Sequence, residues 1–203
     1  SLSMEDLRGY SKEYFQLVKA VPNLVGNVLG QITPDLERDY RSSNTIRHNL
    51  EEEKQHVAPW VLFAESIGVT RNELYDYECS TKTRDAIFNM SQLTRRSLAS
   101  GTSTLYSYEK QLPAISAKKI EGLVNFYGVH NDRALEYFRI HQKVDVEHAE
   151  LWRSLIEHLP ASLHETILDA TSKSLMYQNM ILDGVCDTYL KGRDQLPNQS
   201  WFR

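Results

Sequence analysis

The sequence predicts an all-α fold, and two observations support this. Apolar residues recur mostly every three to four positions, as they do on one face of an α-helix. Glycine and proline are few, with nine and six in 203 residues, so regular structure is seldom broken. With 41% apolar and 25% charged residues, the chain can bury the core of one domain. We therefore expect one helical-bundle domain over residues 1–190 and a polar tail over residues 191–203.

Helix-start signals place the elements of the N-terminal third. Ser3 has an acid three residues on, which is the capping-box spacing, and predicts a helix that runs from there towards Pro22. Thr33, with a proline directly after it, predicts the start of a second helical region that ends near Gly68. The polar stretch 42–44 is expected to interrupt this region.

Three further elements are expected in the middle of the chain. Thr70, again with an acid three residues on, predicts the start of a short helix. A longer helix begins near Thr83 and is expected to bend at Gly101. Another follows Pro113 and ends at Gly128, because glycine is favoured just beyond helix C-termini.

Two long helices are predicted for the C-terminal third. Asn131 is expected to cap the first, which ends before Pro160. Ser162, with a glutamate three residues on, predicts the start of the second, which reaches about Leu190.

The clearest chemical signal lies on the penultimate of these helices. At about 100° per residue, His141, Asp145 and His148 fall within one narrow stripe, so their side chains are expected to point the same way. Glu53 and His56 repeat the three-residue spacing of acid and histidine on another predicted helix. Carboxylate-bridged dimetal sites inside helical bundles are built with this spacing. The two patterns together predict a metal site between helices.

Glu109 supplies a third carboxylate from an aromatic and apolar neighbourhood, where burial of an unpaired acid would cost free energy. A metal ion would remove that cost. Three carboxylates against two divalent cations leave a formal charge of about +1, which suits neutral imidazole ligands. The residues predicted to bind two metals are Glu53, His56, Glu109, His141, Asp145 and His148.

Each pattern also has a structural interpretation that the sequence leaves open. The histidines and the aspartate of the stripe could lie on a solvated helix face or form a hydrogen-bonded network without metal. Acidic runs usually face solvent, and any of Glu51, Glu52 and Glu53 could be the first ligand, of which we favour Glu53. His48 offers a rival stripe with Glu52 and His56.

Charge and composition argue against several other classes of protein. The net charge is −4, and the sequence has no basic stripe interleaved with aromatic residues, so no nucleic-acid partner is expected. The longest apolar run, residues 57–64, is too short to cross a bilayer, so no membrane partner is expected. Cys79 and Cys186 lie far apart and indicate no disulfide framework. A cytoplasmic location fits these features.

With these residues assembled, the sequence resembles the heme-oxygenase-like TenA/PqqC superfamily, and within it the diiron oxidase branch. The similar blocks are residues 56–69, 105–109, 111–120 and 141–149, and the resemblance covers nearly the whole chain up to about Leu190. It implies a heme-oxygenase-like seven-helix bundle. Because residue 1 falls where the second helix of the family begins, the first helix is expected to be missing from this chain.

The resemblance implies an oxidoreductase with two iron ions, and the ligand set is also compatible with manganese or a mixed pair. Dioxygen is the implied co-substrate, and the external reductant comes from an electron donor that the sequence does not identify. The branch is implied to make para-aminobenzoate for folate biosynthesis. A tyrosine of the protein itself would supply the aromatic ring and a lysine the amino group.

Carried onto this sequence, the resemblance gives three residues a catalytic role. Tyr10 matches a tyrosine near the metals, Tyr108 precedes the ligand Glu109, and Lys119 matches the candidate amino donor. The sacrificed tyrosine of the family would lie upstream of residue 1. A homodimer is the family expectation.

Two other functions remain open from the sequence. The same dimetal site could oxidise an external fatty acid or amino acid. In a different class, the bundle could be an interaction protein that binds a death-domain-like partner, although no exposed apolar stripe of helical spacing stands out in the sequence.

Overall fold

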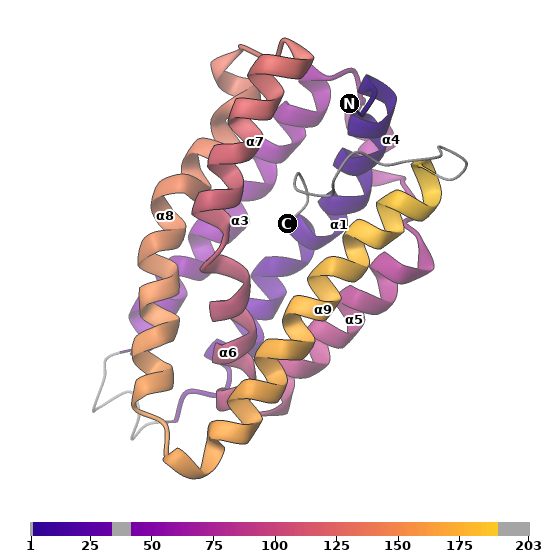
Figure 1. Cartoon of the computed structure of the whole chain (residues 1–203). Coiled ribbons are helices and arrows are strands. Elements are labelled where there is room, and N and C mark those ends of the chain that lie inside the picture. The colour runs from indigo at the N-terminus through magenta and orange to yellow at the C-terminus, as the bar shows by residue number, and fades with distance from the viewer. Residues whose placement is uncertain (1, 34–41, 191–203) are drawn as a thin grey trace.

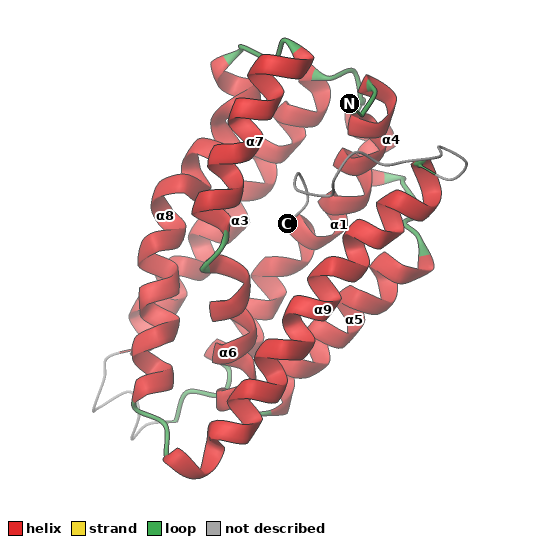
Figure 2. Ribbon diagram, in the orientation of Figure 1, coloured by secondary structure: helices red, strands yellow, loops and turns green. Residues whose placement is uncertain are grey.

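The computed structural model describes residues 2–33 and 42–190, and its regular elements there are all helices (Figure 2). The all-α prediction is confirmed. The proposed tail, residues 191–203, and the proline after Thr33 lie outside the described residues. Within the described part, no helix combines the length and apolar character needed to cross a bilayer.

Seven of the described helices have twelve or more residues and build the bundle in Figure 1. These are α1 (Met4–Leu29), α3 (Ser42–Ser66), α5 (Thr81–Arg96), α6 (Leu98–Glu109), α7 (Leu112–Tyr127), α8 (Asp132–Glu157) and α9 (His164–Tyr189). The short α4 (Arg71–Tyr75) follows α3, and a 3₁₀ turn, η1 (Ala161–Leu163), precedes α9. Helix α3 packs on α1 and α8, and α8 also packs on α6 and α7.

Most helix starts agree with the predictions. Ser3 and Thr70 each form a complete capping box with the acid three residues on. The Asn131 side chain accepts a hydrogen bond from the backbone N–H of Arg133 and caps α8. At the end of α7, Gly128 has φ of 66°, the left-handed conformation that glycine adopts without a steric penalty.

Three predicted boundaries are wrong. Pro22 lies inside α1, which continues to Leu29. The stretch 42–44 does not interrupt a helix, because it forms the first residues of α3. Ser162 lies in the 3₁₀ turn before α9 and makes no capping hydrogen bond to it. A proline in a helix and polar residues at a helix start are both tolerated when tertiary packing stabilises the helix.

The predicted bend at Gly101 is also wrong. The break falls four residues earlier, at Ser97, whose extended backbone separates α5 from α6 and whose side chain caps α6. Gly101 lies inside α6, where a Cβ atom would be 2.6 Å from a methyl group of Val28 and 3.1 Å from the carbonyl oxygen of Thr94. The glycine therefore permits close packing of α6 against α1 and α5 rather than a bend.

A Gly101→Ala substitution is expected to destabilise the protein by about 1–3 kcal/mol, because the added methyl group overpacks a buried contact. Chemical denaturation would measure the change in the free energy of unfolding. Gly26→Ala in α1 is the matched control, since a Cβ atom there would meet nothing within 4 Å. That substitution should be neutral or stabilising by up to about 1 kcal/mol. Equal effects of the two substitutions would contradict the close-packing role of Gly101.

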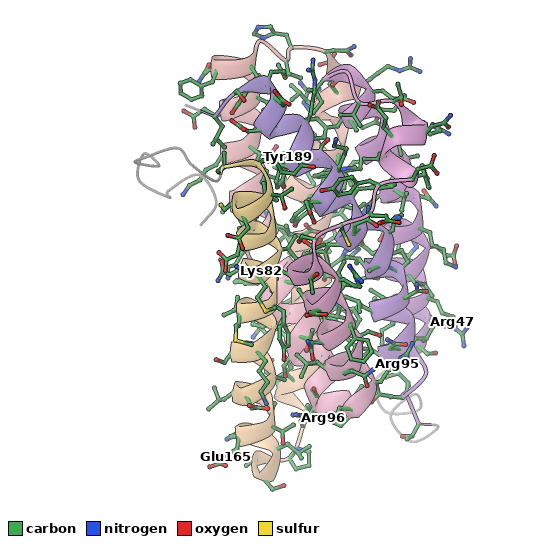
Figure 3. The ribbon with its side chains drawn as sticks, turned by 90° about the vertical axis from the view of Figure 1, so that its right-hand side faces the viewer. Arg47, Lys82, Arg95, Arg96, Glu165 and Tyr189 are labelled. Atoms are coloured by element: carbon green, nitrogen blue, oxygen red, sulfur yellow. The ribbon has the colours of Figure 1, made fainter. Side chains whose placement is uncertain are left out.

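Helices α5 and α9 run antiparallel and are joined by ion pairs at both ends of their contact (Figure 3). Lys82 lies 2.8 Å from Asp187 near one end, and Arg96 lies 3.3 Å from Asp169 near the other. Arg96 therefore lies on a solvated helix face and has a carboxylate partner on the neighbouring helix.

The core of the described residues contains two apolar clusters, and the first has more buried aromatic side chains than the second. Trp60 of α3 is fully buried, with its ring centroid 5.2 Å from that of Phe63 and 4.7 Å from that of Tyr137. Tyr137 also contacts the ring of His141, so the aromatic cluster lies directly beside the metal-binding candidates.

Candidate metal centre

Helix α8 contributes three buried polar side chains to the interior of the bundle. His141, Asp145 and His148 are 1%, 0% and 4% exposed, as expected for a single stripe that faces inward. A polar stripe on a solvated face is therefore ruled out for these residues. Helix α3, which packs on α8, brings Glu53 and His56 to the same place, and both are 5% exposed.

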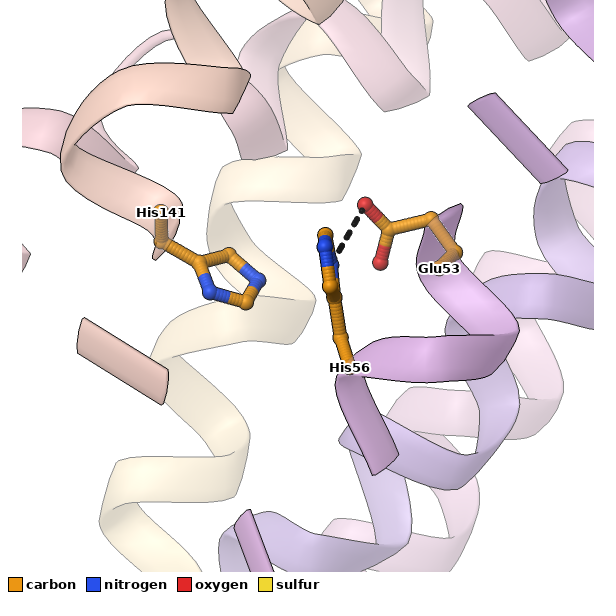
Figure 4. Close-up of side chains that lie close together, drawn as sticks. All are labelled: Glu53, His56 and His141. Atoms are coloured by element: carbon orange, nitrogen blue, oxygen red, sulfur yellow. Dashed lines mark ion pairs between the residues drawn. The ribbon is translucent and has the colours of Figure 1, made fainter. Parts of the chain in front are cut away.

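Glu53 lies at the centre of this group. Its Oε1 atom is 3.3 Å from Nδ1 of His56 and 3.4 Å from Nδ1 of His148. The ring centroids of His56 and His141 are 4.6 Å apart, and Figure 4 shows His56 between Glu53 and His141. One carboxylate from α3 thus reaches histidines of both helices.

Two sets of three side chains could each hold a metal ion. Glu53, His56 and His141 form one set, and Glu53, Glu109 and His148 form the other. In each set the potential ligand atoms lie within 4.8 Å of one another. Glu53 belongs to both sets, which is the position of a carboxylate that bridges two ions.

The structure brings the sixth predicted ligand, Asp145, beside these sets rather than into them. Its Oδ1 atom is 3.6 Å from Nδ1 of His148. The two oxygens of Asp145 are buried and find no hydrogen-bond partner among the described residues. The carboxylate is therefore available to an ion held by its neighbours.

The three consecutive glutamates of α3 have different surroundings. Glu53 faces the interior, Glu52 is partly exposed, and Glu51 is exposed with its Oε1 atom 2.6 Å from the Lys54 ammonium. The geometry thus favours Glu53 as the ligand. The rival stripe is not a buried site, because the side chain of His48 is 75% exposed.

Unpaired polar atoms test whether the site fits a metal. Nδ1 of His56, Nδ1 of His148 and Oε1 of Glu109 are buried and have no hydrogen-bond partner in the described part of the chain. Buried polar atoms are normally paired, and each orphan costs about 1–3 kcal/mol. A set of orphaned nitrogen and oxygen atoms that converge is the donor set that divalent iron accepts. The residues fit the metal.

The acids of the site differ in the direction in which their surroundings shift the pKa. Burial raises the pKa of Glu53, but the nearby imidazoles of His148 and His56 outweigh burial and lower the pKa to about 2. Burial likewise opposes the charged form of His148, but its contacts with Asp145 and Glu53 outweigh burial and raise the pKa of this imidazole to about 11. Without metal, an imidazolium therefore neutralises the Glu53 carboxylate.

For Glu109 and Asp145, the effect of burial on the pKa is larger than that of the neighbouring imidazoles. Burial, followed by the nearby carboxylates, raises the pKa of Glu109 well above its usual range. Burial also raises the pKa of Asp145. Metal ligands must be deprotonated, so a divalent metal would displace a proton from His148 and oppose the protonation of Glu109 and Asp145 that burial favours.

Neighbouring groups orient two of the potential ligands, and the sequence patterns did not indicate these neighbours. Nδ1 of His141 lies 2.7 Å from the backbone carbonyl of Tyr137, so Nδ1–H donates there and Nε2 is left for a metal. The indole N–H of Trp152 donates to Oε2 of Glu109 at 2.5 Å. Trp152 follows His148 by four residues on the same face of α8, a signal that the sequence did contain.

Asn49 is a further residue that the sequence patterns did not indicate. It lies one helical turn before Glu53 on the same face of α3 and is 1% exposed. Both polar atoms of its amide lack a hydrogen-bond partner among the described residues.

The predicted catalytic residues Tyr10 and Lys119 lie together. The Lys119 amine donates a hydrogen bond to the Tyr10 hydroxyl and lies 3.9 Å from the centroid of its ring. Burial of the Lys119 amine lowers its pKa to about 7. Burial also raises the pKa of the Tyr10 hydroxyl well above its usual value, so this phenol is neutral.

A row of aromatic rings joins this pair to the candidate metal-binding residues. The ring centroid of Tyr10 is 6.0 Å from that of Trp60, Trp60 is 4.7 Å from Tyr137, and Tyr137 is 4.1 Å from His141. The third predicted residue, Tyr108, is buried, and its hydroxyl hydrogen-bonds that of Tyr14. Tyr14 in turn stacks on Trp60 with centroids 5.2 Å apart. Neither Trp60 nor Tyr137 was predicted as part of the site.

The sequence matches, over residues 8–179, the profile of the family described as iron-containing redox enzymes. The chain belongs to this family. It is therefore an oxidoreductase of the iron-containing, heme-oxygenase-like class. The matched range, residues 8–179, includes all six residues predicted to bind metal.

Curated relatives carry a more specific name. A protein of Chlamydia trachomatis called 4-aminobenzoate synthase is 32% identical over 192 residues, which span 92% of this chain and 80% of that protein. A protein of the same name from Nitrosomonas europaea is 27% identical over 93% of this chain and 81% of its own length.

Solved structures support the predicted fold. A TenA homolog from Pseudomonas syringae has a TM-score of 0.77 at 18% identity and covers 92% of this chain and 81% of its own. A domain with a heme oxygenase-like fold from Shewanella denitrificans has a TM-score of 0.77 at 16% identity, over 97% of this chain and 85% of its own. The heme-oxygenase-like bundle is thus confirmed.

Proposed function

We propose that this chain is a 4-aminobenzoate synthase that holds two iron ions and consumes side chains of its own. The observation that carries the proposal is the contact between Lys119 and Tyr10, an amine against a phenol, at the end of a row of rings that leads to the metal ligands. The lysine amine can supply the amino group of an aminobenzoate, and a tyrosine of the protein can supply its aromatic ring with the carbon substituent, while dioxygen and the reductant supply the redox equivalents. The name of the curated relatives supports the same product.

Six side chains are proposed to hold the metals. Glu53 would contribute to the binding of both ions. His56 and His141 would be further ligands of one ion, and Glu109 and His148 of the other. Asp145 lies beside His148. Two iron ions, when bound, would supply the redox chemistry that lets dioxygen and an external reductant oxidise a phenol. The surrounding aromatic wall keeps water away from the reacting groups.

Lys119 is proposed as the amino donor because its surroundings favour the reactive form of the amine. With a pKa of about 7, about half of the amine is neutral at neutral pH and has a free lone pair. An ordinary exposed lysine is almost wholly protonated under the same conditions. Tyr10 holds the amine in place through its hydroxyl and its ring.

Tyr10 and Tyr108 are proposed to pass oxidising equivalents rather than to be ordinary core residues. Each belongs to a chain of ring contacts that ends at a proposed ligand or next to one. Trp60 connects both branches, since it contacts Tyr10 and also Tyr14, the partner of Tyr108.

Isotope labelling tests the proposal. Protein is prepared with ¹³C in its tyrosine rings in one batch and ¹⁵N in its lysine side chains in another, loaded with iron, and supplied with dioxygen and a reductant. We expect 4-aminobenzoate that carries ¹³C from the first batch and ¹⁵N from the second, in an amount that does not exceed the protein. Lys119→Arg should abolish the product, whereas Lys118→Arg, at an exposed position of the same helix, should not.

Two results would contradict the proposal. Unlabelled 4-aminobenzoate, or product in excess of protein, would indicate an external substrate at the same metal centre. Absence of both product and bound iron in well-folded protein would indicate that the bundle has a non-enzymatic role.

A further inference from the structure

One contact links the proposed metal centre to the protein surface. Oε2 of Glu52 lies 2.9 Å from Nε2 of His148, and Oε1 of the same carboxylate lies 3.5 Å from Nε2 of His48. The side chain of His148 is 5% exposed, that of Glu52 is 29% exposed, and that of His48 is 75% exposed. Glu52 therefore stands at the boundary between the buried site and solvent.

This contact determines which nitrogen of His148 faces the other ligands. With Nε2 directed at Glu52, the ring presents Nδ1 to Glu53 at 3.4 Å and to Asp145 at 3.6 Å. A neutral imidazole carries a hydrogen on one nitrogen and a lone pair on the other. When Nε2–H donates to the Glu52 carboxylate, the lone pair is on Nδ1, which is the nitrogen directed into the site.

We propose that Glu52 is a positioning residue of the metal centre, which holds the His148 ring so that Nδ1 binds one of the two ions. The proposal rests on the metal centre proposed above. Carboxylates that accept the second N–H of a metal-bound histidine fix its orientation and increase its basicity, and their loss typically weakens metal binding about 10- to 100-fold.

The two histidines of α8 have different hydrogen-bond acceptors. His141 donates to a backbone carbonyl, that of Tyr137, whereas His148 meets a carboxylate. An anionic acceptor makes the imidazole a stronger electron donor than a neutral carbonyl does. Removal of Glu52 should therefore weaken the ion at His148 and leave the ion at His141 largely unchanged.

Glu51 provides a matched control for this effect. It is the adjacent residue of the same helix and carries the same charge, but it pairs with Lys54 at the exposed surface. Glu51→Ala and Glu52→Ala thus change the net charge equally. Only Glu52→Ala removes the acceptor of His148, and Glu52→Gln keeps an acceptor oxygen without the charge.

The test is an anaerobic titration of metal-free protein with ferrous iron. Wild type and Glu51→Ala should bind two ions, and Glu52→Ala should bind one of the two about 10- to 100-fold more weakly. Glu52→Gln should fall between them. Thermal melting of each metal-free variant checks that the bundle is folded.

A second readout follows His148 directly. In zinc-loaded, ¹⁵N-histidine-labelled protein, long-range ¹H–¹⁵N spectra identify which ring nitrogen binds the metal. Nδ1 is expected in wild type, and a mixture of the two nitrogens in Glu52→Ala. Two equally tight ions and an unchanged Nδ1 signal in Glu52→Ala would overturn this proposal while the metal centre stands. Wild type that binds no metal would overturn both.

Discussion

A Glu53→Gln variant is expected to lose both iron ions and to make no detectable 4-aminobenzoate, a decrease in activity of at least about 100-fold. Glu53 is the one residue common to the two sets of potential ligands. Its pKa of about 2 also keeps Glu53 charged at neutral pH without metal. An amide in its place cannot supply the negative charge or bridge two cations. Elemental analysis and product assay of the iron-loaded variant measure the effect.

Glu51→Gln is the appropriate control for this prediction, because Glu51 lies two residues away with its side chain 61% exposed. It should retain two ions and full activity. Retention of one tight ion by Glu53→Gln would mean that the two sets of ligands are independent. In that case Glu53 is not a bridge, and a different acid must connect the ions.

A Lys119→Met variant is expected to make no product and to change the dependence of stability on pH. Burial lowers the pKa of Lys119 to about 7 in the folded protein, against 10.5 for the unperturbed group. Between these values the unfolded chain binds a proton that the folded chain does not, so the free energy of unfolding of wild type rises with pH. One pKa unit corresponds to about 1.4 kcal/mol, and the contribution between pH 7 and pH 9 is therefore a few kcal/mol at most.

Urea denaturation at several pH values from 7 to 9 measures this effect. The stability difference between Lys119→Met and wild type should favour the variant most at pH 7 and shrink as pH rises. Lys118→Met, at an exposed position, should follow wild type throughout. Parallel curves for Lys119→Met and wild type would show that the amine is not held in the neutral form.

The sequence allowed the arrangement of the site to be predicted because its pattern is local. The stripe of α8 follows from helix periodicity alone, and the structure places all three of its residues inside the bundle. Helix periodicity alone does not select Glu53 over Glu51 and Glu52, since neighbouring residues on a helix differ by about 100° and the orientation of α3 depends on its packing. The contacts of Glu53 with His56 and His148 define that orientation.

Features that depend on contacts between distant segments could not be predicted. The aromatic row from Tyr10 through Trp60 to Tyr137 joins three helices, and each ring on its own resembles an ordinary core residue. The same holds for Gly101, whose close approach to Val28 involves a residue 73 positions earlier in the chain. A glycine inside a helical pattern indicates a weak point in the helix and gives no information about its neighbours.

The ligands of the proposed centre come from α3, α6 and α8, which are separated by long stretches of chain. Iron would therefore act as a cross-link between these segments, in addition to their packing and to the polar contacts of His148 and Trp152. Anything that binds the native state alone stabilises it in proportion to the logarithm of the free ligand concentration. The lifetime of this protein against proteolysis would then follow the iron supply of the cell, and an iron-starved cell would lose the enzyme as well as its activity.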